Sequence, residues 1–258
     1  MPRVVGITAK DIHMSKRNSA RENTDPASDV NGVEDASSSV ASDAPGDELV
    51  VDVTLEHTSP MLQSQMDEDT VFDTLVLKKK QPIDTSSSKE ERAEKARYQG
   101  PNGEFGFPIL NASSCFIDGG RYVKFDARRC FTSNDSTVLP AFLRVRSSDP
   151  NYADFVPFLN QEKYKVDVRR GVNRNGASKI TVGIVRPRFD SWAAKVRLVI
   201  SIKDGVTEQS IRRIVEVAGE RSGLCSFRPQ KKGPFGCFKI GQWVIVSDSR
   251  QTAGTKAA

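Results

Sequence analysis

The sequence predicts an α+β protein in which helices cover one face of an antiparallel sheet. Several segments alternate apolar and polar residues with the period of two that is typical of strands. Only one long segment has the spacing of an amphipathic helix. The elements follow each other in mixed order with few helices, rather than as the regular βα repeat of a parallel sheet.

The beginning of the chain predicts a disordered acidic leader. Residues 19–46 are rich in Ser, Asp, Ala and Asn and hold almost no large apolar side chain, so they cannot offset the entropy of ordering. Residues 1–70 carry 5 Lys/Arg and 14 Asp/Glu, a net charge of −9, whereas the rest carry 33 and 19, a net charge of +14. We therefore expect an acidic leader at 1–46, one basic domain at 47–247 and a disordered tail at 248–258.

The first strand is expected at residues 48–57. Val51, Val53 and Leu55 alternate with polar residues, and Pro60 ends the strand because it lacks a backbone donor.

The next segment, residues 78–100, is charged and Ser-rich, which favours an exposed excursion with a helix at 89–98. A further helix is expected to begin at Asn111 or Ser113, both good capping residues. The pair Gly119-Gly120 indicates either that this helix ends there or that another backbone passes close to it.

The second half of the chain predicts more strands and the best helix. Strand periodicity occurs at residues 138–145, 163–170, 179–185, 194–202 and 237–246. Residues 170–176 are rich in Gly and Asn, and we expect them to form the loop of a projecting hairpin.

The helix begins after the N-cap Thr207 and ends at Gly223, with Ile211, Ile214, Val215 and Ala218 on one face. The closing strand–helix–strand unit favours a ferredoxin-like arrangement.

Three stretches resemble known families. The strand that ends in His57-Thr58-Ser59-Pro60-Met61-Leu62 resembles the opening of RAMP-superfamily (Cas7-like) proteins, and residues 106–116 are similar to the segment that opens their first helix. Residues 186–192, together with the final strand–helix–loop unit through residue 238, resemble an uncharacterised family of phage and prophage proteins. The likeness covers roughly residues 48–246 and lacks the usual Lys of the first helix. It implies an RRM-like core that binds RNA or single strands, and it brings no known activity.

The charge of the basic domain favours an anionic partner, above all nucleic acid. Residues 163–203 hold eleven Lys/Arg against only Asp167 and Asp190, and alternation places Lys195 and Arg197 outward of their strand. Phosphate contacts use such cations, and aromatic rings beside them can stack on bases. The predicted contact residues are Lys165, Arg169, Arg170, Arg174, Lys179, Arg186, Arg188, Phe189, Trp192, Arg228, Lys231 and Lys232.

The same residues also allow purely structural interpretations that involve no nucleic-acid binding. The cations can belong to a solvated sheet face with Trp192 in the core, and the loop from Arg228 to Gly236 can be a connector with Phe227 and Phe235 turned inward.

We expect no catalytic site, metal or cofactor. The four cysteines form no C-x-x-C pair, and no Walker A, nucleophile elbow or dinucleotide fingerprint occurs. Glu56 and His57, with residues 67–69, have the chemistry of a general base or metal site but lack motif context, so we expect them to be structural or solvated.

The expected function is therefore non-catalytic binding of single-stranded DNA or RNA through a basic sheet face and loops. The alternatives are a self-assembling structural protein without nucleic-acid binding, or a metal-dependent nuclease. A homo-oligomer and a protein partner for the acidic leader are further expectations. Neither a secretion signal nor an apolar window of 18 residues occurs, so we expect reduced cysteines, no membrane and a cytoplasmic location, that of the host cell if a phage encodes the protein.

Overall fold

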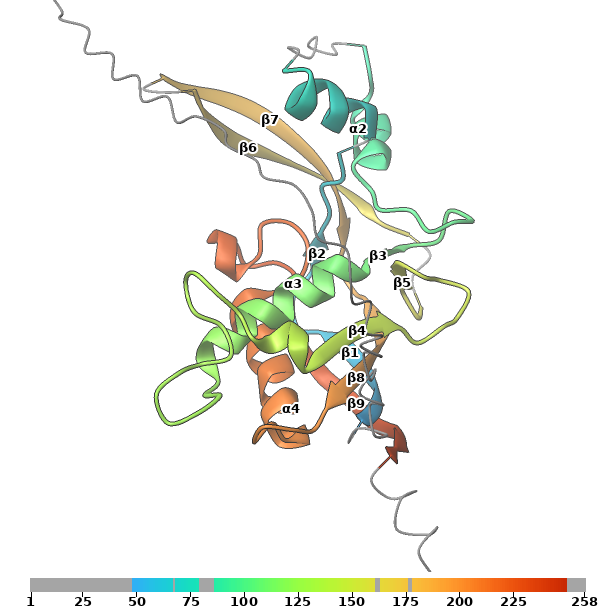
Figure 1. Ribbon diagram of the computed structural model, residues 1–258. Helices are drawn as coiled ribbons and strands as arrows, with labels where there is room; N and C mark the ends of the chain where they lie inside the picture. The colour runs from blue at the N-terminus through green and yellow to red at the C-terminus, as the bar shows by residue number, and fades with distance from the viewer. Residues whose placement is uncertain (1–47, 67, 79–85, 161–162, 176–177, 250–258) are drawn as a thin grey trace, which may run out of the picture. The chain divides into compact units, whose positions relative to one another are not determined.

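The computed structural model describes residues 48–66, 68–78, 86–160, 163–175 and 178–249 (Figure 1). The chain divides into two units, Met1–Ser42 and Asp43–Ala258, and every described residue belongs to the second. The predicted leader at 1–46 and most of the predicted tail lie outside the described residues.

A four-stranded antiparallel sheet lies at the centre of the described unit. Its strand order is β4-β8-β1-β9, with β4 at Leu143–Ser147, β8 at Ala193–Ser201, β1 at Glu48–His57 and β9 at Phe238–Asp248. The strands expected at 48–57, 194–202 and 237–246 are thus confirmed to within two residues.

The strand expected at residues 138–145 was placed too early. Leu139–Ala141 form a single 3-10 turn, and the strand begins only at Leu143. Pro140 is the physical reason, since it has no N–H to donate to a ladder, whereas it fits the first turn of a helix.

Two helices, α3 (Ile109–Gly119) and α4 (Glu208–Val217), pack against one face of this sheet (Figure 1). The sheet presents alternate apolar residues to them, and these are fully or almost fully buried: Leu49, Val51, Val53, Leu55, Ala194, Val196, Leu198 and Ile200. The opposite face carries charged side chains such as Asp52 and Arg197. The mixed α+β class with antiparallel sheets and few helices is confirmed.

The predicted details of α4 are confirmed. Thr207 caps the helix, its side chain accepting a hydrogen bond of 3.1 Å from the backbone N–H of Ser210. Ile211, Ile214 and Val215 are fully buried. A five-residue π-helical turn continues the helix, and the chain leaves it at Gly223, whose φ of +70° favours glycine.

Helix α3 begins earlier than its capping residues suggest. Strand β3 (Gly106–Pro108) pairs with β5 (Phe155–Pro157) and runs directly into the helix, so Asn111 lies inside the first turn. A Cβ on Gly119 would lie 2.6 Å from the carbonyl oxygen of Ile214. The glycine is therefore needed because the chain of α4 passes this close.

The predicted hairpin is confirmed and is longer than expected. Strands β6 (Lys165–Asn175) and β7 (Ser178–Phe189) pair along eleven residue positions, and β2 (Met61–Leu62) pairs with the base of β7. The segment 170–176, expected as the loop, belongs to the strand as far as Asn175. We call β6 and β7 together the arm.

Helix α2 (Lys89–Lys95) lies beside the arm, and it is preceded in the chain by the short helical segments α1 (Glu68–Val71) and η1 (Phe72–Val76). The expectation that residues 78–100 form an exposed excursion is wrong for the end of the segment, where Ala93 is fully buried and Arg97 nearly so.

The reason lies in the fully buried Gln63. Its side chain accepts a hydrogen bond of 2.9 Å from the backbone N–H of Tyr98 and donates one of 2.7 Å to the carbonyl oxygen of Gly106. These bonds hold the chain that follows α2 against the body of the unit.

Candidate nucleic-acid interface

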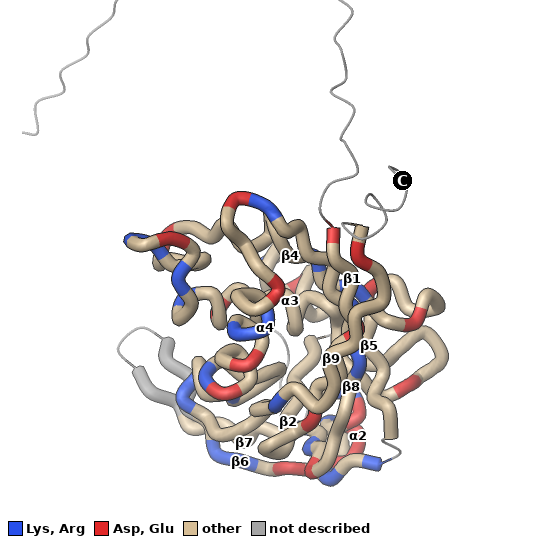
Figure 2. Tube along the Cα trace, turned by 90° about the horizontal axis from the view of Figure 1, so that it is seen from below, with Lys and Arg blue, Asp and Glu red and all other residues tan. Residues whose placement is uncertain are grey.

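The arm places four predicted contact residues on one of its faces. Cross-strand register sets Lys165 opposite Arg188 and Asp167 opposite Arg186, and Arg169 follows two residues later on the same side. We call Lys165, Arg169, Arg186 and Arg188, with the carboxylates of Asp167 and Asp190, the arm face. Figure 2 shows Lys and Arg recurring along β6 and β7.

Carboxylates partly neutralise this face. Arg169 donates two hydrogen bonds to Asp167, of 2.6 and 3.0 Å. Asp190 lies 2.6 Å from both the Lys165 Nζ and the Arg188 Nε, the latter an ion pair without hydrogen-bond geometry. The hydrogen bond from Lys165, followed by the charge of Arg188, holds the pKa of Asp190 below its usual range. Four cations face two carboxylates, so the face keeps a positive excess.

Arg186 is the least satisfied cation of the arm face. Its Nε is buried and has no hydrogen-bond partner among the described residues. Burial lowers the pKa of its guanidinium, the charge of Asp167 opposes this, and Arg169 lowers the pKa further. A desolvated guanidinium with unused donor capacity gains from an added anion.

The arm face meets the loop that connects the end of α4 to β9. The guanidinium carbon of Arg169 lies 4.7 Å from the ring centroid of Phe235, and that of Arg188 lies 5.9 Å from it. Phe227 packs on the same ring, with centroids 5.9 Å apart, and is 36% exposed. We call residues 227–235 the basic loop, since Lys231 and Lys232 in it are exposed.

Close packing fixes the shape of the basic loop. A Cβ on Gly233 would lie 1.9 Å from the carbonyl oxygen of Phe227, so no side chain fits there. Beyond the loop, Gly236 donates a backbone hydrogen bond of 2.8 Å to Pro60 and accepts one of 2.8 Å from Leu224. The end of the loop is therefore held against the segment that connects β1 to β2.

The structure corrects the two predicted stacking residues. Phe189 is fully buried, 5.1 Å from Phe158 between ring centroids, and Trp192 is 2% exposed with its indole N–H donated to the carbonyl oxygen of Ser59. The end of β7 pairs with β2 and enters the core, which carries both rings inward. Neither ring is accessible to a base, so the interpretation with Trp192 in the core is the correct one.

Other predicted residues are distributed differently. Arg170 lies on the opposite face of the arm, where it donates to the hydroxyl of Thr181 at 3.3 Å. Arg228 is only 18% exposed and donates a hydrogen bond of 3.0 Å to the carbonyl oxygen of Cys225, so it braces the basic loop from inside. The side chains of Arg174 and Lys179 lie outside the described residues.

The basic run 163–203 is also split between two sheets. Lys195 and Arg197 lie on the outer face of the four-stranded sheet, not on the arm. There Arg197 pairs with Asp52 at 2.7 Å, and Lys239 pairs with Glu56 at 3.3 Å. Two cations of this face are therefore paired with its own carboxylates, as on an ordinary solvated surface, whereas Arg146 and Lys195 have no ion-pair partner among the described residues.

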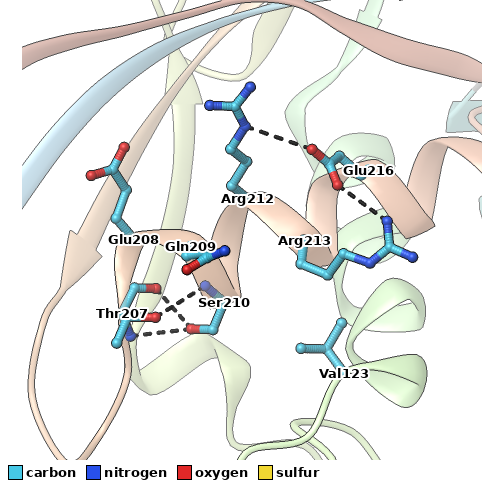
Figure 3. A pocket seen from close by; sticks show the side chains of 8 residues that line it. All are labelled: Val123, Thr207, Glu208, Gln209, Ser210, Arg212, Arg213 and Glu216. Carbon is cyan, nitrogen blue, oxygen red and sulfur yellow. Dashed lines mark hydrogen bonds and ion pairs between the residues drawn. The ribbon is translucent and has the colours of Figure 1, made fainter.

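Among the described residues, two pockets that are lined in part by arginines lie outside the arm face and the basic loop. A pocket of about 770 Å³ borders α4 from its cap at Thr207 to Glu216 (Figure 3), and Glu216 pairs with Arg212 at 3.6 Å and with Arg213 at 3.2 Å. Another, of about 480 Å³, is lined by Arg121, Arg128 and Arg129.

The residues considered for a general base have structural contacts. His57 Nδ1 lies 3.0 Å from the carbonyl oxygen of Trp192 and 3.3 Å from its backbone nitrogen, and the ring tautomer decides which bond forms. The side chains of residues 67–69 lie outside the description. In the described part of the chain, no group of three or more His, Cys, Asp or Glu side chains is arranged to hold a metal ion.

Burial raises the pKa of the Cys225 thiol to about 12 and that of Cys115 further still. No helix within the described ranges is both long and apolar enough to cross a bilayer.

Sequence reasoning missed the aromatic contact of the arm face, which is made by Phe235, with Phe227 packed on that ring. Phe227 and Phe235 flank the Gly-Pro-rich stretch of the basic loop, and the sequence suggested only that they turn inward if the loop is a connector. The pairing of Phe235 with Arg169 joins residues 66 positions apart, a relationship that no local spacing carries.

Comparison of the sequence with protein-family models and with curated proteins finds no match.

Proposed function

We propose that this protein binds single-stranded nucleic acid, without catalysis, through the arm face and the basic loop. The observation that carries the proposal is the contact of Arg169 and Arg188 with the Phe235 ring. It joins the cations of a projecting hairpin to a loop that presents two further exposed lysines, Lys231 and Lys232. Cations on two neighbouring segments are the groups that contact a phosphate backbone.

Single strands fit this surface better than a duplex. The exposed ring of Phe227 lies beside the buried Phe235, so an unpaired base has an aromatic surface to stack on next to the cations. Base–aromatic stacking contributes roughly 1–3 kcal/mol per base and needs no particular sequence. Bases of a duplex are already stacked and offer no such contact.

The order of elements along the chain and of strands in the sheet supports a ferredoxin-like, RRM-like fold for the core. The sequence β1, α3, β4, β8, α4, β9 with the strand order β4-β8-β1-β9 is the order of a split βαβ fold, with the arm as an insertion. RRM domains stack bases on aromatic residues of the central strands. Here the outer positions of the central strands hold Asp52, Thr54, Lys195 and Arg197 instead, which favours the arm as the binding surface. The resemblance to RAMP-superfamily and phage proteins belongs to the same proposal.

The test is fluorescence anisotropy with a labelled single-stranded 20-mer, as oligo(dT) and as oligo(U), over a range of salt concentrations. We expect binding at low salt that weakens steeply as salt rises, because each neutralised phosphate of a single strand adds about 0.7 to the log–log slope. The variant K231A/K232A should reduce that slope by about 1.4. Comparing the two oligonucleotides determines whether DNA or RNA is preferred.

A matched control removes the same charge from the other sheet. Arg146 and Lys195 lie on the outer face of the four-stranded sheet and have no ion-pair partner among the described residues. The variant R146A/K195A should bind like the wild type. Absence of binding at low salt contradicts the proposal, and equal losses in both variants would show that only net charge matters.

A further inference from the structure

The last strand of the chain leaves one edge of the four-stranded sheet open. Strand β9 is terminal in the order β4-β8-β1-β9, and within the described ranges it pairs only with β1. It spans eleven residues, about twice the usual length of a strand. Its outer backbone N–H and C=O groups are a template for pairing with another strand.

This edge is apolar. Val244, Ile245 and Val246 are each about half exposed, at 52%, 49% and 50%. From residue 240 to residue 247 the strand contains no charged residue and no proline, the two features that usually protect an edge from pairing. Most apolar side chains in the neighbouring strands are buried, so this exposure is particular to β9.

Two register shifts leave a straight stretch in the middle of β9. The pairing with β1 is irregular between Val50 and Val51 and between Thr54 and Leu55, which leaves 242–245 in unbroken register with 51–54. A bulge twists an edge away from a partner, so the straight stretch between the two shifts is where pairing can be centred.

The distribution of charge along β9 favours antiparallel over parallel pairing with a second copy. Lys239 lies near the start and Asp248 at the end. Antiparallel pairing with a second copy about Trp243 or Val244 sets the uncharged stretch of the strand opposite itself, and it places Lys239 opposite Ser247 or Ser249. Parallel pairing would place like charges together, which is unfavourable.

We propose that β9 pairs antiparallel with β9 of a second copy of this chain, which joins two four-stranded sheets into one of eight strands. The contact is isologous and therefore closes at a dimer. The other edge strand, β4, is less suited to this role because it has five residues and carries Arg144 and Arg146. The inference does not depend on the proposed binding of nucleic acid, since β9 does not belong to the arm or to the basic loop.

Pairing along one strand buries less than the roughly 1,200–2,000 Å² of a standard stable interface. The dimer should therefore dissociate on dilution. Sedimentation velocity of the full chain over a range of concentrations tests this. We expect a monomer at low concentration and a dimer at high concentration, with no larger species.

The variant V244K/V246K places two charges on the exposed edge without touching the buried face of the sheet. It should remain monomeric at every concentration. The control L110K makes the same kind of change on α3, where Leu110 is 74% exposed, and should dimerise like the wild type. A wild type that stays monomeric, or that grows beyond a dimer, overturns the proposal, as does a dimeric V244K/V246K.

Hydrogen exchange of the wild type gives a second test that needs no variant. Amides of residues 239–247 should exchange more slowly at high protein concentration than at low concentration, and those of β4 should not change. Unchanged exchange in β9 at a concentration where sedimentation shows a dimer would place the interface elsewhere and refute this pairing.

Discussion

The guanidinium of Arg169 lies over the ring of Phe235, with 4.7 Å between the guanidinium carbon and the ring centroid. One residue belongs to β6 and the other to the basic loop, so this contact joins two segments that are distant in sequence. The same guanidinium is held by two hydrogen bonds to Asp167. The cation is thus fixed over the ring.

The contact between Arg169 and Phe235 should give a measurable coupling between the two residues in the free energy of unfolding. In a double-mutant cycle of R169A and F235L, urea unfolding should give a coupling of about 0.5–1 kcal/mol, the range of partly exposed cation–π pairs. The control cycle pairs R170A with F235L, because Arg170 lies on the opposite face of the arm. Equal coupling in both cycles would mean that the contact between Arg169 and the ring contributes nothing specific.

Gly119 should not tolerate a side chain. Alanine is the better helix former by about 1 kcal/mol, yet its Cβ would lie 2.6 Å from the carbonyl oxygen of Ile214. We expect G119A to lower the free energy of unfolding by about 1–2 kcal/mol, because the two helices must move apart. The control is G183A in β7, where a Cβ has no atom within 4 Å, and it should be neutral or slightly stabilising. A G119A protein as stable as the wild type would show that the helices adjust freely.

Gln63 should be required for the attachment of the chain that follows α2. The variant Q63L leaves the N–H of Tyr98 and the carbonyl oxygen of Gly106 without their partners, at about 1–3 kcal/mol for each buried group. We expect urea unfolding to show a loss of about 2–6 kcal/mol. Q99L removes an exposed amide that donates to Glu94, and it should cost far less. Similar losses of unfolding free energy in Q63L and Q99L would show that the two hydrogen bonds of the buried amide contribute nothing specific.

Glu94 should make stability depend on pH. Its hydrogen bond from Arg97, and to a smaller extent that from Tyr164, lower the pKa of the carboxyl from 4.5, although burial opposes the shift. A carboxyl whose pKa is lower in the folded state stabilises the fold above its unfolded pKa and loses this effect as pH falls through its folded pKa. The difference in unfolding free energy between wild type and E94Q should therefore be constant at neutral pH and shrink below about pH 4.5.

The control for this pH dependence is E90Q. Glu90 lies on the same helix and forms a largely exposed ion pair with Lys89, at 3.6 Å. The difference in unfolding free energy between the wild type and E90Q should vary less with pH than the difference for E94Q, because an exposed ion pair contributes little to stability. If the wild type and E94Q differ by the same amount at every pH, Glu94 is not the group that links stability to pH.

Elements with strong local patterns could be predicted from the sequence. The cap at Thr207, the apolar stripe of α4 and the alternation in β1 and β8 depend on neighbouring residues, and each was confirmed. The start of α3 could not be predicted from its capping residues, because β3 pairs with β5 and leads the chain directly into the helix.

The candidate site could be predicted only in part. Charge density selected the whole run of residues 163–203, of which the register of β6 and β7 places Lys165, Arg169, Arg186 and Arg188 on one face. Phe189 looked equally suitable, but its burial depends on β2, which arrives from more than a hundred residues away. The contact with Phe235 depends on the fold of the basic loop, and local spacing does not contain it.

The most direct test of the binding surface is hydrogen exchange of the full chain with and without the single-stranded 20-mer at low salt. Bound strand should slow exchange in residues 165–190 and in the basic loop, and leave β8 and β4 unchanged. Protection on the outer face of the four-stranded sheet, or protection nowhere, would contradict the assignment of the arm face and the basic loop as the nucleic-acid surface.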